Sequence, residues 1–65
     1  MKLQVKDSGA WRNVLPFDAG RTAEVEVAAA ALLRATGGLS TVMRIVDGDL
    51  VMAYCAQPDC LWRTA

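Results

Sequence analysis

The residue types that most often carry chemistry are scarce in this chain. It has no histidine, which removes the usual general base near neutral pH and the commonest metal ligand. Its seven carboxylates fall where turns or helix ends explain them: Asp47 and Asp49 flank a turn glycine. Glu24 and Glu26 are two residues apart on an expected helix, so they do not face each other. The sequence therefore predicts a protein that is not an enzyme, with no catalytic residue and no cofactor.

The two cysteines allow three interpretations. Cys55 and Cys60 flank residues 56–59, and a hairpin loop there would bring their Cα atoms within disulfide range. Alternatively, they could supply half of a zinc site shared with a second chain, although no other Cys or His is present to complete it. We favour two reduced, partly buried thiols, weighing the expected cytoplasmic compartment against the disulfide geometry. No metal site is predicted, and replacing either cysteine by serine is expected to change stability little.

The first seven residues alternate between polar and apolar, which is unlike the continuous apolar run of a signal peptide. The longest apolar stretch, residues 27–33, is far shorter than the roughly 20 residues that span a bilayer. We therefore expect a cytoplasmic protein with no membrane partner.

A first hairpin is expected at the start of the chain. Residues 2–6 alternate with period two, which is typical of a half-buried strand. A three-residue turn over residues 7–9 would place Val5 opposite Trp11 and Leu3 opposite Asn13. Pro16 ends the second strand, because proline has no N–H for the ladder.

A helix and a second hairpin complete the layout. Asp18, or alternatively Thr22, is the expected N-cap, and Gly37-Gly38 ends a helix of about 15–18 residues. Its apolar stripe is predicted to comprise Val25, Ala28, Ala29 and Leu32. Residues 41–46 and 50–55 form a hairpin around an Asp-Gly turn, and residues 61–63 a possible short final strand.

These elements predict one α+β domain spanning residues 1–65. The fold is ββαββ, an antiparallel sheet of four strands, or five where residues 61–63 add a short one, with one helix packed across one face. Either two-residue turn of the second hairpin puts Met43, Ile45, Leu50, Met52 and Tyr54 toward the helix, and Ala53 and Cys55 on the opposite face. The predicted core is Leu3, Val5, Trp11, Leu15, Phe17, Val25, Ala29, Leu32, Met43, Ile45, Leu50, Met52 and Tyr54.

The sheet face turned away from the helix is the candidate binding face. It gathers basic and aliphatic residues without any carboxylate: Lys2, Lys6, Arg12, Val14, Arg44, Val46 and Val51. This face could be an ordinary solvated surface, a surface for a protein partner or self-association, or a nucleic-acid platform. The last is weakened because the predicted registers turn Trp11 and Tyr54 inward, away from this face.

The chain resembles a group of small uncharacterised proteins encoded in phages and prophages of proteobacteria. The resemblance lies in Gly9-Ala10-Trp11-Arg12-Asn13-Val14-Leu15, Phe17-Asp18, Gly37-Gly38, Arg44-Ile45-Val46-Asp47 and Trp62-Arg63. It implies a bacterial cytoplasmic setting and a phage-related accessory role. It implies no activity, ligand or catalytic residue.

The leading hypothesis from the sequence is a non-enzymatic interaction module that binds a protein partner or itself through the candidate binding face. The alternative is a nucleic-acid-binding accessory protein that uses the basic residues of the same face. Binding to generic DNA and RNA at two salt concentrations separates the two hypotheses, because phosphate contacts make affinity fall steeply with salt.

Overall fold

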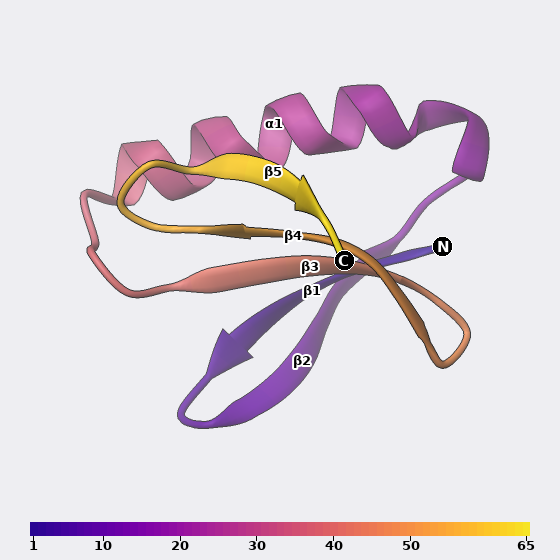
Figure 1. The fold of residues 1–65 in the computed structure, drawn as a ribbon, viewed down its shortest axis with the longest axis horizontal. Helices are drawn as coiled ribbons and strands as arrows, with labels where there is room; N and C mark the ends of the chain where they lie inside the picture. Colours follow the sequence, from indigo (N-terminus) through magenta and orange to yellow (C-terminus); the bar gives the residue numbers. More distant parts are fainter.

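A five-stranded antiparallel sheet with one helix across one face forms the fold of the computed structural model, which describes residues 1–65 (Figure 1). The elements in chain order are β1 (Lys2–Asp7), β2 (Ala10–Pro16), a 3-10 turn η1 (Ala19–Arg21), α1 (Thr22–Thr36), β3 (Val42–Asp47), β4 (Leu50–Ala56) and β5 (Leu61–Thr64). The strand order across the sheet is β2-β1-β3-β4-β5. The predicted α+β class is confirmed, and the short fifth strand is present.

Both ends of the helix follow from local chemistry. The Asp18 carboxylate accepts a hydrogen bond from the Gly20 N–H at 3.4 Å, so the expected cap forms on η1, which leads directly into α1. The N-cap residue of α1 itself is Arg21, which makes no side-chain capping hydrogen bond, and Thr22 is the first helical residue. Gly37 takes the left-handed conformation (φ 70°), and its N–H donates to the Arg34 carbonyl at 3.2 Å. Only glycine adopts that conformation readily. The helix therefore ends where the sequence predicts, and its length of 15 residues agrees with the expectation.

The buried face of α1 differs from the predicted stripe. Ala29, Ala30 and Leu33 are buried, whereas Leu32 is 54% exposed. Every residue from 27 to 33 is apolar, so periodicity could not fix the rotation of this segment.

The first hairpin has a two-residue turn, and the predicted three-residue turn is wrong. Ser8 and Gly9 both have positive φ (53° and 82°), which the mirror-image turns favoured in hairpins require. Asp7 therefore pairs with Ala10, Lys6 with Trp11, and Val5 with Arg12. Trp11 consequently lies on the sheet face opposite α1 rather than in the core.

Each hairpin also contains a β-bulge that the sequence did not signal. In β2 the extra residue is Val14, between the pairs Gln4–Asn13 and Leu3–Leu15. In β4 it is Met52, between the pairs Val46–Val51 and Ile45–Ala53. Because side chains alternate with period two, one extra residue moves every later side chain to the other face.

The bulge at Met52 corrects the predicted faces of β4. Tyr54 pairs with Arg44 on the face opposite α1, and Cys55 pairs with Met43 on the helix side, where it is buried. The sequence had predicted the reverse for both residues. Neither predicted turn of this hairpin anticipates the exchange, because both assume an uninterrupted ladder.

The core lies between α1 and the sheet. Its buried cluster comprises Leu3, Ala29, Ala30, Leu33, Met43, Ile45, Cys55 and Cys60, with Met1, Val5, Phe17, Val25 and Trp62 partly buried against it. Members of the predicted core that lie outside it are Trp11, Leu15, Leu32, Leu50, Met52 and Tyr54. The Trp62 indole N–H donates to the Glu26 carbonyl at 2.7 Å and ties β5 to the helix. No helix here has the length and apolar character needed to cross a membrane.

Candidate functional site

The sheet face opposite α1, here called the open face, carries a row of side chains that crosses all five strands. Direct cross-strand pairs make each member the neighbour of the next. Cross-strand partners have Cβ atoms about 4.5–5.5 Å apart. In order from β2 to β5, this polar row is Asn13, Gln4, Arg44, Tyr54 and Arg63.

Arg44, at the centre of the polar row, is held on two sides. Its Nε donates to Gln4 Oε1 at 2.8 Å, and Gln4 Nε2 donates in turn to Asn13 Oδ1 at 2.9 Å. Its guanidinium carbon lies 4.0 Å from the centroid of the Trp11 ring. No ion pair or other hydrogen bond engages Arg44. Its two terminal NH₂ groups are therefore free to bind a ligand.

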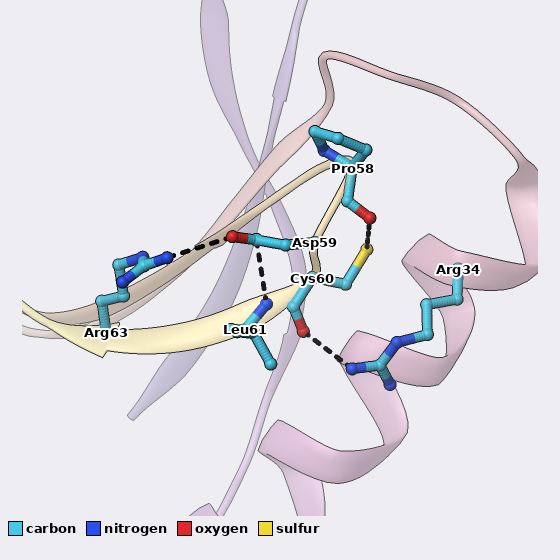
Figure 2. A network of polar contacts seen from close by, with 6 residues as sticks. All are labelled: Arg34, Pro58, Asp59, Cys60, Leu61 and Arg63. Atoms are coloured by element: carbon cyan, nitrogen blue, oxygen red, sulfur yellow. Dashed lines mark hydrogen bonds and ion pairs between the residues drawn. The ribbon is translucent and has the colours of Figure 1, made fainter.

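The ion pairs leave an excess of positive charge on the open face. Three of the seven basic residues are paired with carboxylates, namely Arg12, Arg21 and Arg63. Lys2, Lys6 and Arg44 have no such partner, and the strand register places all three on the open face. The one carboxylate bound to this face, that of Asp59, is held by Arg63 at 3.0 Å (Figure 2). A chain with no net charge thus presents one positively charged surface.

The structure brings together five of the seven residues of the predicted binding face. Lys2, Lys6, Arg44, Val46 and Val51 share the open face. Val46 is only 6% exposed, however, so it offers a ligand little apolar surface.

Arg12 and Val14 lie on the helix side of the sheet instead. The corrected turn pairs Arg12 with Val5, and its Nε binds the Asp7 carboxylate at 3.1 Å. The bulge turns Val14 toward an apolar hollow that Leu15 and Leu32 also line. Both displacements follow from the register of the first hairpin.

Two aromatic side chains of the open face were missed in the sequence. Trp11 reaches it through the two-residue turn, a turn that Ser8-Gly9 could have signalled. Tyr54 reaches it through the Met52 bulge, for which the sequence contains no local signal. Tyr54 is 41% exposed, whereas Trp11 is half-buried beneath Arg44.

The cysteines lie in the core on the other side of the sheet. Both are free, and Cys55 and Cys60 are 0% and 1% exposed. Burial raises the pKa of the Cys55 thiol, and the neighbouring Cys60 adds to that effect. The Cys60 thiol donates to the Pro58 carbonyl at 3.7 Å, and Arg34 donates to the Cys60 carbonyl at 3.2 Å (Figure 2). Because its raised pKa keeps the Cys55 thiol protonated at neutral pH, Cys55 is a poor nucleophile.

No three side chains of the metal-ligating types lie close enough together to hold an ion. We take the open face as the candidate site, because Lys2, Lys6 and Arg44 share it with Trp11 and Tyr54. Comparisons with protein-family models, curated proteins and solved structures found no match to this chain. The phage-related role and the bacterial, cytoplasmic setting stay predictions, and a function has to be argued from the open face itself.

Proposed function

We propose that this protein is a non-enzymatic binding module whose open face binds single-stranded nucleic acid. The observation that carries the proposal is that Lys2, Lys6 and Arg44, none paired with a carboxylate, share one sheet face with Trp11 and Tyr54. Proteins that bind single strands combine a positive surface along the backbone with aromatic rings on which bases stack.

The aromatic side chains of the open face support nucleic-acid binding over the binding of a protein partner. Nucleic-acid binding ranked second from the sequence alone because Trp11 and Tyr54 were predicted to point inward, and both lie on the open face. A single strand is favoured over a duplex, because a ring on a sheet can stack only on bases that are not already paired and stacked.

Fluorescence anisotropy with a labelled 12-nucleotide oligo(dT) at 50 and 200 mM salt tests the proposal. Three phosphate contacts give a slope of log affinity against log salt of about −2 for a single strand. The double variant Lys2→Ala/Lys6→Ala should weaken binding and reduce the magnitude of that slope by about 1.4. Arg21→Ala is the matched control, because Arg21 is exposed, paired with Glu24 and remote from the open face.

Two results would contradict the proposal. One is a parent protein that shows no salt-dependent binding to the oligonucleotide. The other is an Arg21→Ala variant that loses as much affinity as the double lysine variant.

Binding to a protein partner or to a second copy stays a prediction. The sequence supported this hypothesis by aliphatic side chains on the open face, and that support is weaker because Val46 is buried. Exposed apolar side chains lie instead on the helix side of the sheet, on β2 and on α1. They are Val14, Leu15 and Leu32, at 41%, 47% and 54% exposure. Sedimentation equilibrium of the parent and of Leu15→Lys would show whether the chain self-associates through these residues.

A further inference from the structure

We infer that Arg44 and Tyr54 together bind one nucleotide of the strand, with Arg44 donating to the phosphate and Tyr54 stacking on the base. This inference rests on the proposed function and names the residues that carry it. The two side chains are direct cross-strand neighbours on β3 and β4. Adjacent strands lie about 4.8 Å apart, so a phosphate at Arg44 leaves the base of the same nucleotide within reach of Tyr54.

Arg44 is arranged to bind a phosphate through both terminal NH₂ groups. The Gln4 amide holds its Nε at 2.8 Å and Trp11 supports the guanidinium plane at 4.0 Å, so the side chain is ordered before a ligand arrives. Such preorganisation lowers the entropic cost of binding. The planar fork matches two phosphate oxygens, a geometry that a lysine ammonium cannot reproduce.

Tyr54, rather than Trp11, is the ring available for stacking. The Arg44 guanidinium covers the Trp11 ring, and the Lys6 ammonium lies 5.9 Å from the same centroid. Tyr54 has no comparable cover and is 41% exposed. Trp11 therefore positions Arg44, and Tyr54 contacts the ligand.

The neighbour of Tyr54 on its other side, Arg63, is a weaker candidate for the phosphate. Its NH₂ group is already bound to the Asp59 carboxylate at 3.0 Å, and the Leu61 N–H holds the second oxygen of that carboxylate at 3.3 Å (Figure 2). A phosphate would have to displace Asp59 to reach Arg63. This leaves Arg44 as the guanidinium in the polar row without a competing anion.

The test compares oligo(dT) with an abasic strand of the same length, which keeps the phosphates and lacks the bases. Arg44→Lys should weaken binding of both strands roughly tenfold, because the charge stays and the fork is lost. Tyr54→Ala should weaken binding of oligo(dT) roughly tenfold and leave the abasic strand unaffected. Tyr54→Phe should bind oligo(dT) like the parent, because it keeps the ring.

Gln4→Glu tests the positioning of Arg44 from the other direction. A carboxylate at this position would form an ion pair with the guanidinium and compete with phosphate, so both strands should bind more weakly. The melting temperature of the variant should be equal to or higher than that of the parent. The inference is overturned if Arg44→Lys binds both strands like the parent, or if Tyr54→Ala weakens the two strands equally. If the parent protein nevertheless binds oligo(dT), only the inference about Arg44 and Tyr54 fails and the proposed function stands. If the parent protein binds neither strand, the inference and the proposed function both fail.

Discussion

Gln57 is the polar side chain that joins the end of the helix to the sheet. Its Oε1 accepts from the Thr41 N–H, and its Nε2 donates to the Leu33 carbonyl and the Thr36 hydroxyl, all at 2.8 Å. The residue is 8% exposed, and no buried side-chain polar atom of the protein lacks a partner. Because hydrogen bonds to buried groups are costly to remove, this one amide fixes the position of α1 over β3 and β4.

Replacing Gln57 by leucine should lower the free energy of unfolding by about 2 kcal/mol or more, because it leaves the Thr41 N–H and the Leu33 carbonyl without these partners. Urea denaturation measures the change. Leu39→Ser is the control, because Leu39 is 76% exposed in the connection before β3. A Gln57→Leu variant within about 0.5 kcal/mol of the parent, the range of ordinary surface substitutions, would refute this role.

Burial of Cys55 makes the free energy of unfolding depend on pH in the alkaline range. Its pKa is raised by burial above the usual 9.0, so the folded protein keeps the proton at pH values where the unfolded chain releases it. The stabilising contribution is therefore complete below pH 9.0 and is lost as the pH rises toward the folded-state pKa. The free energy of unfolding, measured from pH 8 upward, should fall more steeply with pH for the parent than for Cys55→Ala. Parallel curves for the two proteins would contradict this role of Cys55.

Cys55→Ser should destabilise the fold by about 1–3 kcal/mol, since it places a hydroxyl in an apolar site. This replaces the sequence-based expectation of a small effect.

At the scale of elements, the number of residues in each turn and strand determines which side chains reach the open face. Turns and caps at Asp18, Gly37 and the Asp47–Asp49 segment were predictable, because they depend on local conformational preferences. The helix rotation was not, because residues 27–33 are uniformly apolar. The faces of Trp11 and Tyr54 depend on a turn length and a bulge, each of which shifts a strand by one residue. The candidate site was thus only partly predictable, although its basic members Lys2, Lys6 and Arg44 were found.

Deleting Met52 should leave Tyr54 on the open face and Cys55 in the core, and should change stability about as little as Met52→Ala. Because Met52 is the extra residue of the bulge, the ladder without it continues with the pairs Arg44–Tyr54 and Met43–Cys55. Met52 is 37% exposed, so truncating its side chain removes little packing. Thermal unfolding of the two variants measures the difference. A deletion variant that melts far below Met52→Ala would show that the local twist of the bulge is itself required.

At the scale of the whole molecule, the two sides of the sheet have different tasks. The side facing α1 contains the buried cluster, and the open face contains three of the four basic side chains without a carboxylate partner; the fourth, Arg34, lies on α1. The overall charge conceals this asymmetry, because the carboxylates without an ion-pair partner sit at turns and on the helix: Asp18, Glu26, Asp47 and Asp49. Composition alone therefore underestimates how strongly one surface attracts an anion.

The position of the helix has a consequence for amide hydrogen exchange. The contacts from Gln57, Trp62 and Arg34 tie α1 to the later part of the chain, whereas Figure 1 shows the β1–β2 hairpin extending away from the helix. As an edge strand, β2 hydrogen-bonds only to β1, so its amides should exchange through local opening well before those of β3.

Trp11 and Asn13, which help hold Arg44 in place, both lie on this less protected strand. A bound single strand would stabilise the paired form of the β1–β2 hairpin and slow exchange along residues 10–16, although the proposed contacts lie on β1, β3 and β4. Exchange followed by mass spectrometry with and without oligo(dT) measures this coupling. Equal exchange in β2 with and without oligo(dT) would show that ligand binding by the Arg44 guanidinium does not depend on the β1–β2 hairpin.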